Sequence, residues 1–384
     1  MGQRVAIVGV GQTHHTSVRR DVNGIELINE AVMRALDSAE LTIHDIDAII
    51  IGNMDHFEAI NGVDTWSVDG CGAFMKPIMK LTTGGTTGTT VATGAYHHVA
   101  SGFFDTVLAI GWEKNSESDT TGAIITCTDP IWERFSYSGA LPSLAAEATA
   151  YMKAYGVTER DAARVAVRDR NHASLNPFAH LRDKITVDDV MNSPMYSYPI
   201  KLLDICPRTD GACAVVFASE SRAKRMTSSP AWVLATTSRH EYAWLSDIDY
   251  TRMVSLEGAC REAYKLAGIR DPGKEIDVVE LYQPYSFAGL KWMEAMGVCR
   301  PGEAAQLVWD GVTDLGGEIP FNPSGGVLAT NCIGATALLR VGEAALQVQG
   351  KAGAHQVPDV KLAVATGFGG AFWSDVVVLG REPR

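Results

Sequence analysis

Several features that would direct the interpretation are missing from this sequence. It has no apolar run of the roughly 18 residues that a membrane helix requires, and no basic run accompanies its net charge of −12. Its seven cysteines are odd in number and never spaced as Cys-x-x-Cys. We therefore expect no membrane or nucleic-acid partner, no disulfide framework and no metal site, and we predict a reducing cytoplasmic location.

The N-terminal segment excludes two further classes. MGQRVAIVGVG is too short and too strand-like for a signal peptide. It resembles the start of a dinucleotide-binding fold, but the third glycine of that motif is missing. We therefore expect no bound cofactor. With 384 residues, 46% of them apolar, the chain has enough material for one large globular domain or two similar ones.

One stretch, residues 82–102, organises the rest of the chain. Small residues including Gly85, Thr86 and Thr87 lead into a helical pattern, and a strand-like run follows over residues 105–113. Such a helix entrance lets a ligand approach the backbone and offers it N–H donors. The alternative is a helix packed tightly on a neighbour through its small residues.

The chain repeats this stretch near its C-terminus. Residues 333–350 form a second small-residue helix pattern followed by a strand-like run, and DIDAIIIGN (45–53) matches EIDVVELYQ (275–283) ahead of each copy. Two similar halves tend to pack about a pseudo-two-fold axis. We predict an N-terminal half over residues 1–228 and a C-terminal half over residues 229–384, with the paired helix entrances meeting near the centre.

The first half contains a long insertion. Residues 114–205 lose the regular alternation and show one clear helix near 158–170, so we predict a lid or a substrate-binding subdomain. Its aromatic residues could line a bulky apolar pocket or build the insertion's own small core. They are Trp132, Phe135, Tyr137, Tyr151, Tyr155, Phe178, Tyr196 and Tyr198.

Four segments carry a family resemblance: NPSGG (322–326), GFGG (367–370), LLDICPRTDGACAVVFASE (202–220) and SGFFDTVLAIGWEK (101–114). They resemble the thiolase superfamily, in particular the sterol-carrier-protein-like thiolases that work with a small zinc-ribbon/OB-fold accessory subunit. The resemblance implies an α/β thiolase fold, with two duplicated β-α-β halves in a five-layer α-β-α-β-α sandwich. It also implies coenzyme A as co-substrate, a homodimeric core and the accessory subunit.

The family's catalytic residues are not in place. The resemblance aligns Gly85 with the nucleophilic cysteine and Tyr282 with a histidine. Asn331 and Cys332 replace the histidine and proline of a Gly-His-Pro motif, and Thr366 lies in the strand end that resembles His-Asn-Leu-Gly-Gly.

What remains suggests two catalytic candidates and a set of donors. Cys332, at a helix entrance that would lower a thiol pKa, is a nucleophile or a small packing residue. Tyr282 is a hydrogen-bond donor in catalysis or a structural tyrosine. Asn331 and Thr366 are side-chain donors for a thioester enolate. The expected substrate- and CoA-binding positions are Gly85, Thr86, Thr87, Ser324, Gly325, Gly326, Gly369 and Gly370.

Three functions stay open. We place thiolysis of a bulky, aromatic β-oxoacyl-CoA into two CoA esters first, because the whole-chain resemblance favours it. The missing nucleophile favours retro-aldol cleavage of a β-hydroxyacyl-CoA, which needs an oxyanion site but no acyl-enzyme. The loss of catalytic residues also fits a non-catalytic CoA-binding scaffold for a partner subunit.

Overall fold

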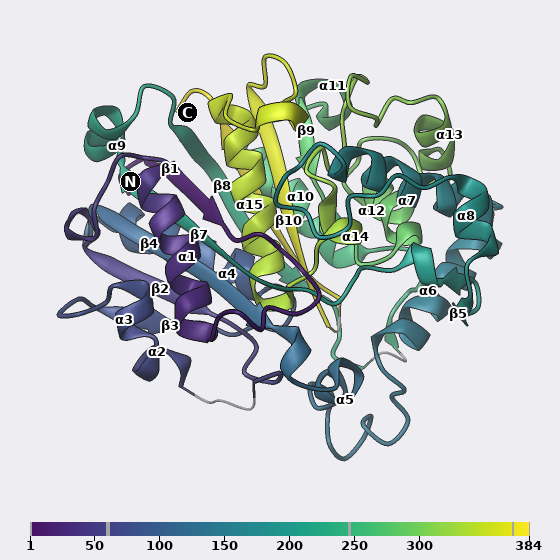
Figure 1. Ribbon diagram of the computed structural model, residues 1–384. Helices are drawn as coiled ribbons and strands as arrows, with labels where there is room; N and C mark the ends of the chain where they lie inside the picture. Colours follow the sequence, from purple (N-terminus) through teal and green to yellow (C-terminus); the bar gives the residue numbers. More distant parts are fainter. Residues whose placement is uncertain (1, 59–61, 245–246, 371, 384) are drawn as a thin grey trace.

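A computed structural model describes residues 2–58, 62–244, 247–370 and 372–383 of the chain. Nine strands form one mixed sheet in the order β3-β2-β4-β7-β1-β8-β11-β10-β9, and two more form a small hairpin (Figure 1). The sheet strands are β1 (Val5–Gln12), β2 (Ala48–Gly52), β3 (Ile78–Lys80), β4 (Thr106–Lys114), β7 (Asp210–Ser219), β8 (Ala231–His240), β9 (Val278–Glu280), β10 (Leu362–Gly369) and β11 (Trp373–Gly380). The hairpin strands are β5 (Met195–Ser197) and β6 (Ile200–Lys201).

The sheet consists of two groups of strands with the same topology. In the first group β2 is parallel to β4, β4 is antiparallel to β7, and β7 is antiparallel to β1. In the second group β9, β10, β11 and β8 repeat these three relations in the same order. The groups join only where Ala6 and Ile7 of β1 face Trp232 and Ala231 of β8. The predicted duplication is therefore visible in the topology.

A matching aspartate fixes the same corner in each half. The Asp47 carboxylate accepts hydrogen bonds from the amides of Asp105 and Thr106, at 2.9 and 2.8 Å. The Asp277 carboxylate accepts them from Lys361 and Leu362, at 2.7 and 2.8 Å. Each aspartate satisfies the amides at the start of the neighbouring parallel strand, which would otherwise lack partners at the sheet edge. The sequence repeat thus extends to individual hydrogen bonds.

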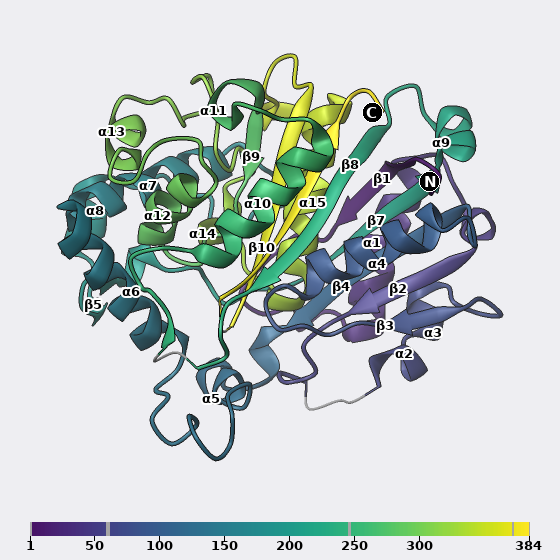
Figure 2. The same cartoon turned by 180° about the vertical axis from the view of Figure 1, so that it is seen from behind.

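Alternating side chains on the strands separate three cores. On β1, Ala6 and Val8 pack with helix α1, whereas Val5 and Ile7 point to the interior layer with α4 and α15. In the second group Val364 and Val378 pack outward against α10 and α12. The period of two that β-strands impose therefore produces five layers, with α4 and α15 in the middle (Figures 1 and 2). This is the layered fold that the sequence predicts.

The main helices begin where the sequence supplies caps. Asn23 accepts from the Glu26 amide ahead of α1, and Thr158 forms a capping box with Asp161 ahead of α7. None of the helices in the described ranges is long and apolar enough to cross a membrane. The α-helices are α1 (Gly24–Asp37), α2 (Val63–Trp66), α3 (Val68–Cys71), α4 (Thr87–Ala100), α5 (Thr120–Ile125), α6 (Ala140–Tyr155), α7 (Glu159–Ala173), α8 (Val187–Asn192), α9 (Glu220–Met226), α10 (Val254–Ala267), α11 (Pro272–Glu275), α12 (Ser286–Ala295), α13 (Ala304–Trp309), α14 (Gly326–Ala329) and α15 (Ile333–Gln349).

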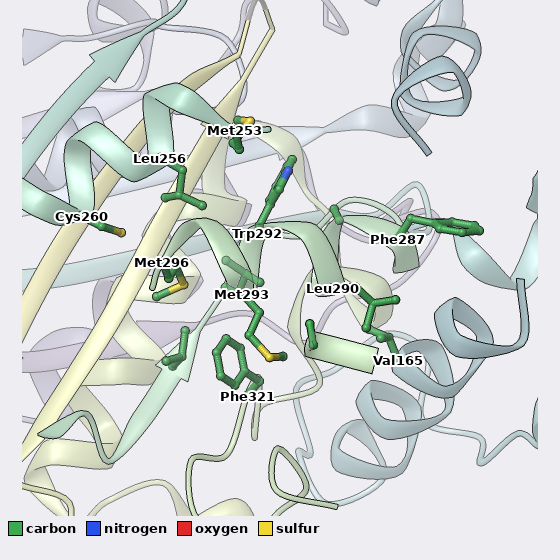
Figure 3. Close-up of a cluster of buried hydrophobic side chains, with 14 of the residues drawn as sticks. Val165, Met253, Leu256, Cys260, Phe287, Leu290, Trp292, Met293, Met296 and Phe321 are labelled. Atoms are coloured by element: carbon green, nitrogen blue, oxygen red, sulfur yellow. The ribbon is translucent and has the colours of Figure 1, made fainter. Parts of the chain in front are cut away.

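The long segment between β4 and β7 packs on the second half of the chain. Its helices α6 and α7 share a core with α10 and α12, and both views place them beside α12 (Figures 1 and 2). Figure 3 shows the α12 side of this core, where Trp292, Met293 and Met296 lie beside Leu256 of α10. The segment contains helix α6, which the sequence analysis missed because its alanine-rich pattern has no strong apolar stripe.

The aromatic residues of this segment follow neither expectation as a group. Tyr151 is buried and donates to the Glu294 carboxylate at 2.7 Å. Four others are exposed on loops or on the β5–β6 hairpin: Trp132, Phe135, Tyr196 and Tyr198. A common apolar pocket lined by all eight is therefore wrong, and so is a common small core.

Candidate active site

The two helix entrances lie against each other and against the ends of β4 and β10. A Cβ atom added to Gly88 of α4 would lie 2.2 Å from the amide nitrogen of Leu338 in α15. One added to Gly111 of β4 would lie 2.9 Å from the Cα of Ala335, and one on Gly367 of β10 would lie 2.2 Å from Oγ1 of Thr89. Glycine is required at these positions because backbone and side chain approach too closely for any Cβ. The predicted meeting of the two entrances is confirmed.

Gly85 packs directly against the backbone carbonyl group of Phe368. A Cβ atom at position 85 would lie 2.3 Å from the Phe368 carbonyl oxygen, far inside van der Waals contact. The neighbouring Gly369 lies beside Thr86, since its own Cβ would come 3.3 Å from the Thr86 hydroxyl oxygen. The loop before α4 and the end of β10 therefore form one tight junction, in which no side chain fits at position 85.

The threonines of the α4 entrance hold the turn together. The Thr86 hydroxyl donates to the Thr83 carbonyl at 2.7 Å, and the Thr87 hydroxyl donates to the Gly84 carbonyl at 2.6 Å. The Thr87 amide also donates to Gly84, at 3.0 Å. Deeper in the helix, Thr89 donates to the buried Asp375 carboxylate at 2.7 Å. These contacts shape the entrance. They also use the Thr87 amide, so the expectation that this amide serves as an open donor is wrong.

The α15 entrance carries Asn331 and Cys332. The Asn331 side chain donates to Sγ of Cys206 at 3.2 Å and accepts from the Thr336 hydroxyl at 2.9 Å. The backbone amide of Asn331 donates to the Thr209 hydroxyl oxygen at 3.1 Å. The Asn331 side chain is thus held in one orientation by its neighbours, as a positioned donor requires.

Cys332 is at the start of α15, as predicted, but its surroundings do not favour a thiolate. Burial raises the pKa of the thiol to about 12, which outweighs the helix entrance. Its Sγ lies 4.0 Å from Nδ1 of His15, and burial lowers the pKa of that imidazole to about 3. A neutral thiol beside a neutral imidazole is not an activated nucleophile. The expectation of a lowered thiol pKa is wrong.

Tyr282 is buried against the same region. Burial raises the pKa of its phenol, so the hydroxyl stays protonated at neutral pH and is suited to donate a hydrogen bond rather than to accept a proton as a base. Its amide donates to the Thr366 hydroxyl oxygen at 2.8 Å, which leaves the Thr366 hydrogen free to point elsewhere. The Tyr282 ring packs near Phe368, with ring centres 6.3 Å apart. The structure thus brings Tyr282, Thr366 and the Gly85 junction together around Phe368.

The 322–326 loop is held by internal contacts. Its amides are already used, because Gly325 donates to the Asn322 carbonyl at 2.9 Å and Gly326 donates to the Ser324 hydroxyl at 3.2 Å. Ser324 itself donates to the buried Glu280 carboxylate at 2.7 Å and accepts from Arg340 at 2.7 Å. The expectation that these two glycine amides serve as open donors is wrong, since both have partners within the chain.

Two carboxyl groups that the sequence analysis did not single out, those of Glu113 and Glu58, lie behind the α15 entrance. One oxygen of Glu113, the Oε2 atom, accepts from the amides of Met54 and Gly334, both at 3.0 Å. Burial, with the Glu58 carboxyl next in importance, raises the pKa of Glu113 well above its usual range. Burial also raises the pKa of Glu58. The buried Glu58 carboxyl therefore disfavours the ionised form of Glu113.

Sequence reasoning missed three residues of this region. Phe368 lies inside a recognised motif, but nothing in the sequence says that its carbonyl fills the space at Gly85. Glu113 ends the strand-like run 105–113, and a charged residue at the end of a buried strand was the available hint. His15 follows the segment that resembles a dinucleotide-binding motif, and no sequence pattern links it to Cys332.

Comparison with known proteins agrees with the fold. Residues 5–221 match the model of the thiolase N-terminal domain, and residues 236–381 match that of the thiolase C-terminal domain-like family. The chain is 34% identical to an acetyl-CoA acetyltransferase of Methanothermobacter thermautotrophicus, over 95% of this chain and 96% of that protein. It is 28% identical to sterol carrier protein 2 of Bos taurus, over 96% of this chain and 71% of that protein.

Two further matches concern a different reaction. A 17-hydroxy-3-oxo-4-pregnene-20-carboxyl-CoA lyase of Mycobacterium tuberculosis is 30% identical, over 85% of this chain and 86% of the lyase. The solved structure of an Ltp2-ChsH2(DUF35) aldolase superposes with a TM-score of 0.84 at 26% identity, covering 100% of this chain and 99% of that chain. The matching domains, the relatives and the duplicated layers all agree. The chain therefore belongs to the thiolase family and is an enzyme of that family of acyltransferases.

Proposed function

We propose that this chain cleaves the bond between the α and β carbons of a bulky CoA thioester through an enolate, with no acyl-enzyme at position 85. The observation that carries the proposal is the junction of Gly85 with the Phe368 carbonyl, where a Cβ would lie at 2.3 Å. A nucleophilic side chain has no room there. The two cysteines near the junction, Cys206 and Cys332, have pKa values raised by burial to about 12.

Retro-aldol cleavage of a β-hydroxyacyl-CoA fits this arrangement best. A base, which we do not assign to a residue, takes the proton of the β-hydroxyl. The Cα–Cβ bond breaks, the β carbon becomes a carbonyl, and the electron pair moves onto the thioester oxygen as an enolate. The enolate then takes a proton at the α carbon, which returns the proton that the base removed. This reaction needs positioned donors and no covalent nucleophile. Thr366, with its free hydroxyl hydrogen, the oriented Asn331 amide and the protonated Tyr282 are the donors that we assign to the two oxygens. Two aldolase-type or lyase-type relatives support this assignment.

Thiolysis of a β-oxoacyl-CoA is the second candidate, favoured by the 34% identity to an acetyl-CoA acetyltransferase. Here the thiolate of free coenzyme A attacks the β-ketone directly, the same Cα–Cβ bond breaks, and two CoA esters form. The whole-chain resemblance to thiolases with an accessory subunit adds a finer proposal. The substrate would be aromatic, as in the thiolase subunit of benzoylsuccinyl-CoA thiolase.

One experiment separates the two reactions. The purified protein is incubated with 3-hydroxy-3-phenylpropionyl-CoA, or with 3-oxo-3-phenylpropionyl-CoA plus free CoA, and the products are resolved by chromatography. The retro-aldol reaction releases benzaldehyde and acetyl-CoA, whereas thiolysis yields benzoyl-CoA and acetyl-CoA. Product from neither substrate, with both thioesters bound, would replace the proposal by a CoA-binding scaffold.

Tyr282→Phe removes only the phenolic hydroxyl and tests the donor role. Loss of one oxyanion donor typically lowers kcat by about 100-fold, with a smaller change in KM. Tyr264→Phe is the matched control, because Tyr264 donates to the Met296 carbonyl at 3.0 Å in a different core. Equal effects of the two substitutions would mean that Tyr282 is structural.

We also propose that the chain works as a homodimer with a small zinc-ribbon/OB-fold subunit, in the cytoplasm. The support is the match to the structure of the Ltp2-ChsH2(DUF35) aldolase, in which a DUF35 protein accompanies the aldolase. Co-expression with the adjacent small open reading frame, followed by size-exclusion chromatography with light scattering, tests both parts. Elution of the chain alone, with full activity, would contradict the accessory subunit.

A further inference from the structure

Phe368 differs from the other residues of β10 in its exposure to solvent. All eight residues of this strand are described, and Phe368 alone among them is partly exposed. Its carbonyl oxygen fills the space in front of Gly85, so the residue lies at the junction where the proposed reaction occurs. The nearby Gly370 faces open space, since nothing lies within 4 Å of a Cβ added there. Phe368 is therefore the residue of β10 that is partly open to solvent beside this junction.

The Phe368 ring packs against three buried aromatic side chains. The ring centre of Trp292 lies 4.5 Å from that of Phe368, with the planes 46° apart. Phe372 packs edge-on at 6.0 Å, and Tyr282 packs at 6.3 Å. All three supporting residues are buried. A ring held from behind by three others is a fixed wall rather than a flexible side chain.

Polar contacts fix the support in turn. Lys291, beside Trp292 on α12, donates to the Glu147 carboxylate at 2.6 Å and to the Tyr250 carbonyl at 2.8 Å. The Trp292 indole donates to the same carboxylate at 3.4 Å. Because Lys291 and Glu147 are buried, this ion pair has little freedom. It links α12 to α6 behind the aromatic wall.

We propose that Phe368 determines the acyl specificity of this enzyme, by stacking on a flat aromatic or fused-ring acyl group of the CoA thioester. The inference rests on the proposed function for the location of the acyl group. A planar ligand ring gains an offset-stacked or edge-on contact with the fixed ring, whereas a linear acyl chain gains no such contact.

The test measures binding, so that it does not depend on which reaction occurs. The dissociation constants of 3-phenylpropionyl-CoA and hexanoyl-CoA, which carry no β-oxygen to be cleaved, are measured by calorimetry on the purified protein with its accessory subunit. The wild type is expected to prefer the phenyl ester. Phe368→Leu is expected to weaken the phenyl ester about fivefold and to leave hexanoyl-CoA within about twofold.

Two further variants make the result specific. Phe368→Tyr keeps the ring and should restore the preference, whereas Phe372→Leu slackens the support and should leave the ring stacking in place. Equal weakening of both esters by Phe368→Leu, or no change in either, would overturn the proposal. A shifted preference without cleavage of any substrate would refute the proposed reaction and leave the specificity role intact. If Phe368→Leu does not fold, Phe368→Met serves as the ring-free variant.

Discussion

The entrances of helices α4 and α15 occupy matching positions in the two halves of the chain, but different groups lie in front of them. In β4, Val107 pairs with Ala48, and in β10, Ala363 pairs with Val278, the residue that the repeat aligns with Ala48. Counting forward along each strand makes Glu113 the counterpart of Gly369. Glu113 reaches over the α15 entrance and accepts the Gly334 amide at 3.0 Å. Gly369 has no side chain, so no carboxyl group from its strand covers the α4 entrance, where the backbone carbonyl of Phe368 lies instead.

This difference shows how a duplicated fold comes to have one site. The α15 entrance is closed by an internal carboxyl group, which satisfies a helix amide and excludes an external anion. The α4 entrance keeps its backbone facing the junction with Phe368. We infer that the thioester oxygen is bound at the α4 side, while the α15 side supplies positioned side chains such as Asn331. The following substitutions test that division.

Gly85→Ala should have the largest effect. The new Cβ would lie 2.3 Å from the Phe368 carbonyl oxygen, so the backbone junction must open. Overpacking of this kind costs about 3 kcal/mol of unfolding free energy, and we expect cleavage activity to be lost as well. Urea denaturation and steady-state kinetics measure the two effects.

Gly370→Ala is the matched control, because a Cβ there meets nothing within 4 Å. Its φ lies outside the left-handed region, so alanine fits without strain. It should leave the unfolding free energy within about 0.5 kcal/mol. Similar destabilisation by both alanines would mean that crowding at Gly85 is not what matters.

Glu113→Ala should have the next largest effect, on stability. It leaves the buried amides of Met54 and Gly334 without an acceptor, at a cost of about 2 kcal/mol. Glu113→Gln keeps a carbonyl oxygen for both amides and resembles the protonated acid that the raised pKa implies. We expect the glutamine variant to unfold near the wild-type midpoint and to stay active. An inactive but stable glutamine variant would give the α15 side a catalytic carboxyl.

The burial of His15 beside Cys332 should affect how the unfolding free energy depends on pH. Burial lowers the pKa of His15 to about 3, so the folded state keeps this imidazole neutral while the unfolded chain binds a proton below about pH 6.5. The unfolding free energy should therefore fall as the pH drops, by about 2 kcal/mol between pH 7 and pH 5 from His15 alone.

His15→Asn tests this assignment. The variant should show a flatter pH dependence of the urea midpoint over the same range, by close to one proton. His172, whose pKa burial lowers to about 4, keeps a similar slope in both proteins. Parallel pH profiles for the variant and the wild type would show that His15 is accessible to protons in the folded state.

Cys332→Ser should have the smallest effect on catalysis. The thiol is buried and protonated, and its Sγ is 4.0 Å from a neutral imidazole. We expect kcat/KM to stay within about threefold of the wild type. A loss of 100-fold or more, or acyl labelling of Cys332 detected by mass spectrometry, would make this cysteine the nucleophile and restore covalent thiolysis.

The sequence by itself determined the duplicated architecture. The matched segments 45–53 and 275–283, the small-residue helix entrances and the period-two strands all describe local patterns, and local patterns are readable in order along the chain. The helix near residues 158–170 and the absence of a nucleophile at Gly85 were readable for the same reason. The helix α6 was not, because its alanines give little contrast between faces.

The tertiary structure alone decided the chemistry of the centre. Phe368 blocks Gly85, Glu113 closes one helix entrance, and Ser324 binds the Glu280 carboxylate. All three contacts join residues 44 to 283 positions apart in the chain. Burial then reversed the expectation for Cys332, since a thiolate loses more from desolvation than it gains from a helix entrance. Such effects arise from packing between distant segments, which a one-dimensional pattern does not contain.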